Sequence, residues 1–279
     1  MSFYSYDPQS LEKHGKSFYW ASFFLPNKNK DAASELYSIC RYFDDLADKA
    51  TTDQSEKLKS EFEQICNNVE HPINKFFKSN NIHIQILGDL IQGLIQDQKL
   101  VRIQTEKDLI EYSYQVAGTV GLMMQPLILV KNKNANKHAV DLGIAMQLTN
   151  IARDVIEDQK MNRQYIKPDF ENIEATLKLA DMFYESSYTS IKKIPFKYRF
   201  AIIVARRVYR QIGRKIIQKR NMENYEKSGK IYVNNFGKIY QTILSLFDLM
   251  FLYLKDVESH QRVREHEIIR EEINLDERI

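Results

Sequence analysis

One segment of the chain, between residues 136 and 160, carries a narrow polar stripe on an otherwise apolar helix. At about 100° per residue, Gln147, Asn150, Asp154 and Asp158 project into an arc of about 80°. The remaining circumference is mostly apolar: Leu142, Ile144, Ala145, Met146, Leu148, Ile151, Ala152, Val155 and Ile156. A helix that is apolar nearly all round is usually buried. The fold must therefore enclose a strip of amides and carboxylates.

Composition favours helices as the surrounding elements. The chain has 9 glycines and 6 prolines among 279 residues, less than half of the average share of about 12%. Sheet-rich folds use these residues in their many tight turns, so sandwiches, barrels and glycine-looped nucleotide folds are disfavoured. A hydrophobic content of 43% excludes general disorder. We expect an all-α fold.

The charge balance and the cysteines narrow the function classes. Lys and Arg number 40 against 37 Asp and Glu, which argues against nucleic acid as a partner. Cys40 and Cys66 form neither a disulfide framework nor a zinc pattern. No signal peptide is visible, and the apolar run at 240–254 is short of the ~20 residues that span a bilayer. We expect a cytoplasmic protein, with peripheral contact at the inner membrane face left open.

We expect one helical domain over residues 1–254, followed by a charged tail at 255–279. Asp31 is a candidate N-cap for the first long helix, Pro72 a break, and Pro126 the point where a helix over 106–130 is interrupted. Periodicity predicts helices over 31–49, 55–69, 82–98, 106–130, 136–160, 173–191, 197–219 and 237–254.

A second carboxylate pair lies on the predicted helix 31–49. Tyr37, Arg41, Asp44 and Asp48 are spaced 4, 3 and 4 residues apart and share one face. Asp44 and Asp48, like Asp154 and Asp158, would lie one turn apart, roughly 5–6 Å between Cβ atoms. Taken alone, such a pair is usually a solvated acidic face with Arg41 as its ion-pair partner.

Two such pairs on apolar helices change the interpretation. Neighbouring carboxylates in a poorly solvated site repel each other and shift towards protonation. A divalent cation removes that repulsion, and carboxylate and amide oxygens suit Mg²⁺, which commonly holds phosphates. The pairs thus predict a site for a metal-bridged diphosphate. The alternative is a satisfied ion-pair network with Arg41 and Arg153.

The two aspartate blocks also resemble a known family. Asp44–Asp48 after Cys40 and Arg41, and the run Gln147–Asp158, resemble the two aspartate-rich motifs of the squalene/phytoene synthases, the bacterial phytoene synthases most closely. Further similar blocks follow the family order over about 14–238: His14–Phe18, Tyr114–Met124, then Arg163, Tyr165 and Pro168, and Ala205–Gly213.

The resemblance implies a single-domain isoprenoid-synthase-type helical bundle around a central cavity. It also implies the head-to-head condensation of two geranylgeranyl diphosphates through a presqualene-type cyclopropyl intermediate to phytoene, an early step of carotenoid biosynthesis that releases diphosphate. The alternatives are a squalene or dehydrosqualene synthase that uses farnesyl diphosphate, and a non-catalytic relative that acts as an assembly factor.

The same resemblance assigns roles to individual residues. Asp44 and Asp48 would bind Mg²⁺ from one wall, and Asn150, Asp154 and Asp158 from the facing wall. Tyr114 would lie beside the reacting carbons. The diphosphate-contacting or ligand-orienting residues would be Arg41, Gln147, Arg163 and Tyr165, and those closing the mouth His14, Lys16 and Ser17. Lys230 stands where the family often has Arg, which slightly weakens the assignment of a diphosphate contact to this position.

The implied cofactor is Mg²⁺, with Mn²⁺ as an alternative metal. No glycine-rich fingerprint indicates NADPH, and the phytoene reaction would not require it. The expected partners are prenyl diphosphates, and other carotenoid-pathway enzymes are candidates for assembly.

Two late features each have two interpretations. The basic stretch from Arg206 to Arg220 is typical of a solvated helix face, and alternatively of a surface that contacts anionic lipids. The apolar run 246–252 is typical of a core helix, and alternatively of peripheral membrane docking. In addition, Gly118, Gly121 and Gly143 lie inside predicted helices, where we expect them to provide space or bends for substrate.

Overall fold

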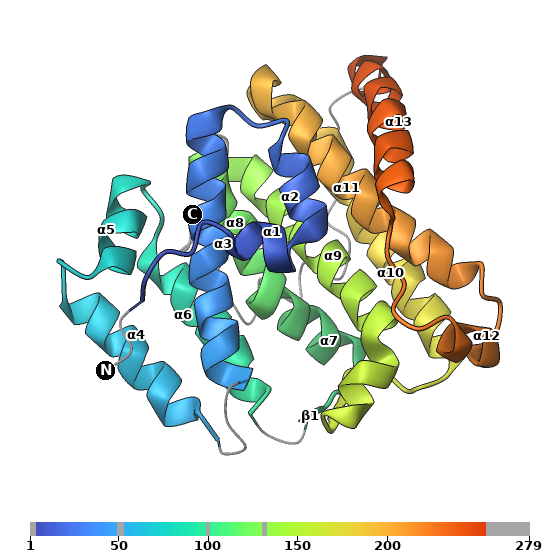
Figure 1. The fold of residues 1–279 in the computed structure, drawn as a ribbon, viewed down its shortest axis with the longest axis horizontal. Helices are drawn as coiled ribbons and strands as arrows, with labels where there is room; N and C mark the ends of the chain where they lie inside the picture. The colour runs from blue at the N-terminus through green and yellow to red at the C-terminus, as the bar shows by residue number, and fades with distance from the viewer. Residues whose placement is uncertain (1–3, 49–52, 99–100, 130–132, 255–279) are drawn as a thin grey trace.

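The computed structural model describes residues 4–48, 53–98, 101–129 and 133–254, and nearly all of them are helical (Figure 1). The only strands among them, β1 (Val101–Arg102) and β2 (Arg163–Gln164), form one short parallel pair. The helices are α1 (Ser10–His14), α2 (Lys16–Ser22), α3 (Asn27–Asp48), α4 (Ser55–Asn67), α5 (Pro72–Ser79), α6 (Ile84–Gln96), α7 (Glu106–Ser113), a π-helix (Tyr114–Gly118), α8 (Thr119–Leu127), α9 (Lys133–Lys160), α10 (Phe170–Thr189), a 3₁₀ turn (Ser190–Lys193), α11 (Phe196–Ile217), α12 (Met222–Lys227) and α13 (Asn235–Leu254). The all-α expectation is confirmed, and the predicted tail 255–279 lies outside the described residues.

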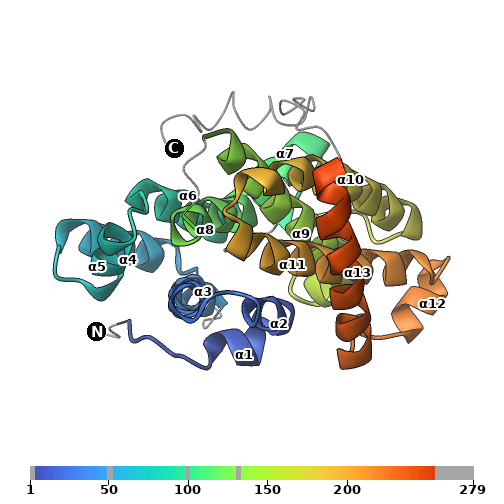
Figure 2. The ribbon, with the colours of Figure 1, turned by 90° about the horizontal axis from the view of Figure 1, so that it is seen from above.

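Helix α9 occupies the middle of the molecule. The π-helix, α8, α10 and α11 pack around it, while α3 packs against α6 and α8 on one side (Figures 1 and 2). The apolar positions of α9 are buried as expected, with Ile144, Ala145 and Leu148 fully inaccessible to solvent. The side of α9 that carries the polar stripe is left to face a pocket.

The expected single helix over 106–130 is three elements. A π-helix at Tyr114–Gly118 separates α7 from α8, and it is this segment that interrupts the helix. Pro126, which we expect to kink or interrupt the helix, does not divide it, because it lies within the last turn of α8, which ends at Leu127. Short π segments inside helices are frequent at functional sites.

The helical glycines allow two helices to approach closely. A Cβ on Gly121 would lie 2.2 Å from the Ala139 carbonyl oxygen of α9, and one on Gly143 would lie 2.3 Å from the Ala117 carbonyl oxygen of the π-helix. On Gly118 it would meet the Tyr114 ring at 3.0 Å. The expectation that these glycines provide space for substrate is therefore wrong, because protein atoms already fill the space beside them.

Of two predicted helix boundaries, the start at Asp31 is wrong and the break at Pro72 is confirmed. Helix α3 begins at Asn27, so Asp31 lies inside it, and the Pro26 carbonyl accepts from the amides of Asn29 and Lys30. Pro72 begins a helix, since a proline at the first helical position lacks only an amide that would have no helical partner there. The His71 side chain caps this helix by accepting from the Ile73 amide at 3.3 Å.

Helix α13 packs on α11 at the edge of the bundle (Figure 2). Four of the six apolar residues in the run 246–252 are exposed, namely Leu246, Phe247, Met250 and Phe251, so the core-helix interpretation is wrong for most of this helix. Within the described ranges, none of the helices has the length and apolarity needed to cross a membrane.

Candidate active site

A pocket of about 230 Å³ lies where α3 and α9 face each other. Both predicted carboxylate pairs line it: Asp44 and Asp48 from α3, and Asp154 and Asp158 from α9. Its complete lining is Arg41, Asp44, Ala47, Asp48, Leu94, Asp97, Tyr112, Val116, Gln147, Asn150, Ile151, Asp154, Asp158, Arg163 and Tyr165. Most of the predicted site residues thus meet in one place, although α3 and α9 are about a hundred residues apart in the chain.

Arg163 links the two walls of the pocket. It lies on β2, whose pairing with β1 is extended by a hydrogen bond from the Ile103 amide to the Gln164 carbonyl at 3.1 Å. From there its Nη2 donates to Asp48 Oδ1 at 3.0 Å. Nearby Asp97 raises the pKa of the Arg163 guanidinium, so Arg163 stays charged.

The ion pairs satisfy only part of the acidic cluster. Arg41 bonds the neighbouring Asp45 at 2.6 Å rather than Asp44. Asp154 pairs with Arg153 at 2.5 Å and lies 3.5 Å from Lys230. Among the described residues, no hydrogen bond or ion pair involves the side chain of Asp44 or Asp158. The alternative of a satisfied ion-pair network therefore accounts for one carboxylate of each pair and leaves the other without a partner.

The two carboxylates without partners have strongly perturbed pKa values. Burial raises the pKa of Asp44 to about 7, with Asp48, Asp45 and Asp97 adding to the rise and Arg41 opposing it. Burial likewise raises the pKa of Asp158 to about 7, with Asp154 adding and Arg163 opposing. The expected shift towards protonation is confirmed for these two groups, and it marks a site with too much negative charge for its surroundings.

Asp97, which the sequence did not single out, is a third acidic group in the pocket. It follows the last residue of α6 and accepts from Tyr112 at 2.7 Å and from Tyr165 at 2.8 Å. The two tyrosine rings stack with centroids 4.7 Å apart. Burial raises the pKa of Asp97, and the two tyrosine hydrogen bonds oppose the rise. A lone aspartate at a helix end has no periodic signal, so only the tertiary structure reveals it.

Asn150, on the polar stripe of α9, is an uncharged candidate ligand in the pocket. Asn150 Nδ2 donates to Gln147 Oε1 at 3.4 Å, while Asn150 Oδ1 is buried and has no partner. A buried acceptor without a donor is costly and fits a site completed by a ligand. Within the described ranges, no three His, Cys, Asp or Glu side chains are close enough to hold a metal ion as they stand, and Asp48 and Asp154 instead turn to arginines.

Four predicted site residues lie outside the pocket lining. Tyr114 is fully buried in the π-helix, and its hydroxyl donates to Asp89 Oδ2 at 3.0 Å. His14, Lys16 and Ser17 lie where α1 ends and α2 begins. Their assigned roles stay predictions.

Comparison with known proteins identifies the family. The sequence profile of the family described as "Squalene/phytoene synthase" matches residues 11–169, which is more than half of the chain. The chain belongs to the squalene/phytoene synthase family. It is an enzyme of the prenyltransferase type, and the family's reaction is the head-to-head condensation of prenyl diphosphates.

Curated relatives in this family carry two kinds of name. The 15-cis-phytoene synthase of Enterobacter agglomerans is 29% identical over 247 residues, covering 75% of this chain and 84% of the relative. The 4,4'-diapophytoene synthase of Staphylococcus haemolyticus is 27% identical over 282 residues, covering 96% and 95%.

Solved structures agree on the fold. The crystal structure of a dehydrosqualene synthase in complex with ligand superimposes with a TM-score of 0.75 at 28% identity, covering 88% of this chain and 95% of that protein. The squalene synthase HpnC from Alicyclobacillus acidocaldarius has the same fold, with a TM-score of 0.66 at 17% identity. The expected isoprenoid-synthase bundle is confirmed, and so is membership in the family.

Proposed function

We propose that this enzyme condenses two geranylgeranyl diphosphates to phytoene in carotenoid biosynthesis, with release of diphosphate. The observation that carries the proposal is the convergence of both aspartate pairs and the partnerless Asn150 Oδ1 on one pocket. The chain length of the substrate follows the relatives named phytoene synthase, such as those of Enterobacter agglomerans and Pseudescherichia vulneris.

The donor set of the pocket fits a divalent metal. Asp44, Asp48, Asn150, Asp154 and Asp158 offer only oxygen ligands, which Mg²⁺ prefers and Mn²⁺ also accepts. Burial raises the pKa values of Asp44 and Asp158, and no cation of the described residues pairs with either carboxylate. When bound, Mg²⁺ would supply positive charge to the departing diphosphate. Loading would require Asp48 and Asp154 to give up their present contacts with Arg163 and Arg153.

The cations and polar groups around the carboxylates would hold the diphosphate. Arg163 and Arg41 are charged donors on opposite walls, and the Arg41 Nε is buried without a partner. Gln147 orients Asn150, and Tyr165 holds Asp97. Within the lining, Leu94, Val116 and Ile151 offer apolar surface on which a prenyl chain would exclude water. We retain Tyr114 beside the reacting carbons, and His14, Lys16 and Ser17 at the mouth, as parts of this proposal.

A second candidate is the condensation of two farnesyl diphosphates to dehydrosqualene. One observation favours it, because the 4,4'-diapophytoene synthase of Staphylococcus haemolyticus aligns over 96% of this chain, against 75% for the relative from Enterobacter agglomerans. The two candidates share the pocket and differ only in prenyl length.

The deciding experiment is turnover by the purified protein with Mg²⁺ and either geranylgeranyl or farnesyl diphosphate, followed by product analysis. We expect a 40-carbon product from geranylgeranyl diphosphate without NADPH. A 30-carbon product formed with a much higher kcat/KM would favour the second candidate. No turnover of either diphosphate would overturn both.

A further inference from the structure

Helix α13 has its polar side chains inside and its apolar side chains outside. Its buried positions are Ser245, Leu252, Lys238, whose Nζ donates to the Lys16 carbonyl of α2, and Gln241, which accepts from Arg207 of α11. The exposed positions are Phe236, Ile239, Tyr240, Ile243, Leu246, Phe247, Met250, Phe251, Tyr253 and Leu254, with Phe236 84% and Met250 67% exposed. Such contiguous apolar surface on a folded protein marks a contact with another body.

The exposed face of α13 is continuous and uncharged. At about 100° per residue its apolar positions fill one arc of about 160°, opposite the buried polar positions. The helix has only two charged residues, and both turn towards the protein: Lys238 Nζ donates to the Lys16 carbonyl at 3.3 Å, and Asp248 pairs with Arg207 at 2.7 Å. The outer face therefore offers mainly aromatic and aliphatic groups, with Asn235 and the tyrosine hydroxyls as its polar groups.

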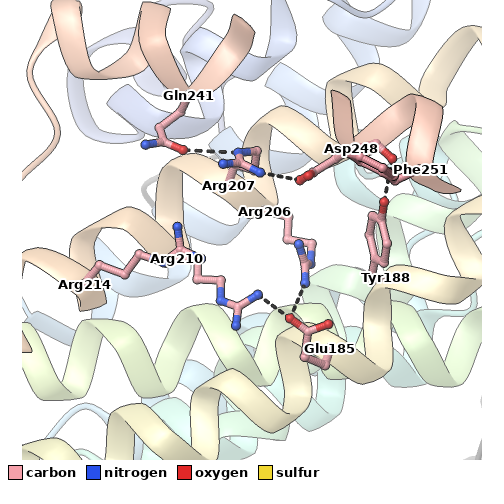
Figure 3. A pocket seen from close by; sticks show the side chains of 9 residues that line it. All are labelled: Glu185, Tyr188, Arg206, Arg207, Arg210, Arg214, Gln241, Asp248 and Phe251. Atoms are coloured by element: carbon pink, nitrogen blue, oxygen red, sulfur yellow. Dashed lines mark hydrogen bonds and ion pairs between the residues drawn. The ribbon is translucent and has the colours of Figure 1, made fainter. Parts of the chain in front are cut away.

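A basic pocket of about 300 Å³ opens along one flank of this face (Figure 3). Four arginines of α11 line it, namely Arg206, Arg207, Arg210 and Arg214, against two carboxylates, Glu185 and Asp248. Arg206 is 4% exposed and donates to the Tyr184 carbonyl at 2.9 Å, so the solvated-face interpretation is wrong for this residue.

Arg214, at the rim of this pocket, differs from the other three arginines. It is exposed, and its side chain makes no hydrogen bond or ion pair with the described parts of the chain. Phe251 belongs both to the pocket lining and to the exposed apolar face, so the two features adjoin. The rim thus presents positive charge next to apolar groups.

We propose that the outer face of α13 and the arginine pocket beside it dock onto the surface of an anionic lipid bilayer. An interfacial helix lies in the plane of the membrane with aromatic and aliphatic side chains towards the acyl chains and cations at the headgroups. The face of α13 supplies the first part, and the exposed Arg214 at the rim of the arginine pocket supplies the second.

Charge selects a bilayer over a second copy of this chain. A symmetric dimer on α13 would bring two arginine-lined rims close to each other, and juxtaposed like charges oppose association. An anionic headgroup layer instead complements the rim. This inference goes beyond the proposed reaction and does not depend on it, because docking requires neither the aspartate pocket nor a prenyl diphosphate.

The test is flotation of the full-length protein with vesicles, in the absence of substrate. The wild-type protein should float with vesicles of phosphatidylcholine that contain about one third phosphatidylglycerol. The double variant Phe247→Ser/Met250→Ser should bind about tenfold more weakly, since two half-exposed apolar groups are lost. Arg214→Gln should weaken binding about fivefold on these vesicles and change nothing on phosphatidylcholine alone.

Matched controls lie on α4, at the other end of the molecule from α13 (Figure 1). Val69→Ser removes an exposed apolar group just after α4, and Lys57→Gln removes an exposed cation on it, so both should float like wild type. Absence of wild-type flotation would overturn the proposal. So would concentration-dependent dimers that the double variant abolishes, or a lower unfolding temperature of that variant with unchanged flotation, since these outcomes assign the face to a second copy or to this chain itself.

Discussion

The pocket between α3 and α9 and the arginine pocket beside α13, called the groove from here on, both contain partly buried charged groups. The groove pairs its charges, whereas the pocket leaves two carboxylates without a partner. In the groove, Arg207 bonds Asp248 at 2.7 Å and Arg206 pairs with Glu185 at 3.3 Å. In the pocket, Asp44 and Asp158 have raised pKa values and no cation of their own.

The difference separates charges that hold helices together from charges kept for a ligand. A paired charge below the surface resists removal because its partner would be left alone. An unpaired carboxylate in a poorly solvated site weakens the fold until a cation arrives. Removing carboxylates from the two regions should therefore have opposite effects on stability and on turnover.

The largest expected effect is on turnover and comes from Asp158→Asn. This change keeps the shape of the side chain and leaves no arginine without its partner, unlike a change at Asp154, which pairs with Arg153. We expect kcat/KM to fall about 10²- to 10³-fold, because a group that meets the diphosphate charge is lost. The unfolding temperature at pH 7 should stay equal or rise.

The matched control is Asp181→Asn on α10, which loses the contact with Arg210 Nε of α11. We expect turnover within about twofold of wild type, because Asp181 does not line the pocket. Wild-type turnover by Asp158→Asn would remove that carboxylate from the proposed metal site.

The second prediction compares Gly121, which packs against the pocket wall α9, with Gly213 on α11, the helix that lines the groove. Gly121→Ala would press a Cβ onto the backbone of α9, the wall that carries the polar stripe, and should lower the free energy of unfolding by about 3 kcal/mol. Gly213→Ala on α11 meets only the flexible Leu177 side chain at 3.0 Å, and a helical alanine is favoured over glycine. Its effect should stay within about 1 kcal/mol. Urea unfolding measures both, and equal losses would show that α8 and α9 can separate at little cost.

The third prediction concerns the paired charges. Asp248→Asn leaves Arg207, which is 16% exposed, without its carboxylate, and should lower the free energy of unfolding by about 2 kcal/mol. Lys227→Gln, which removes a pair exposed to 71% and 73%, should change it by about 0.5 kcal/mol or less. Urea unfolding of the two variants gives the comparison. A loss for Asp248→Asn no larger than that of the control would show that the groove is not held by its ion pairs.

The sequence predicted the pocket better than the groove for a physical reason. Helical periodicity is local, so the spacing of Asp44 and Asp48, and that of Asp154 and Asp158, already determines that each pair shares a face. Asp97 reaches the same pocket only through the tertiary arrangement of α6, Tyr112 and Tyr165, which no spacing reveals. Lys230 was noted, and it does lie at the site, bonded to Glu157 at 2.6 Å.

The wrong predictions for α13 and for the helical glycines share one cause. The sequence pattern does not show which element packs against these residues. Apolar residues of α13 were expected inside, but α11 presents arginines to that helix, so Gln241 and Asp248 turn inward and the apolar side is exposed. Gly121 and Gly143 were assigned to substrate, whereas the neighbour is a helix backbone. In both cases the pattern identifies an unusual position, and only packing shows what it contacts.

The last expected effect is a pH dependence of stability that arises from the two carboxyls in the pocket. A carboxyl whose pKa rises from 3.8 to about 7 on folding binds its proton more tightly in the folded state. The folded state then holds more protons than the unfolded state between about pH 4 and 7, so stability is lost as pH rises through that window. Without metal, we expect Asp44→Asn/Asp158→Asn to gain stability over wild type between pH 5 and pH 7, by roughly 2 kcal/mol for each carboxyl removed.

Urea unfolding at pH 5, 6 and 7 in a chelating buffer measures this gain, and the same series for Asp181→Asn on α10 is the control. Added Mg²⁺ should stabilise the wild type at pH 7 and leave the double variant unchanged, because the cation would replace the missing partner of the two carboxylates. If the stability difference between the double variant and the wild type stays constant across this range, Asp44 and Asp158 ionise as solvated aspartates do. The contrast between an unsatisfied pocket and a satisfied groove would then have no energetic basis.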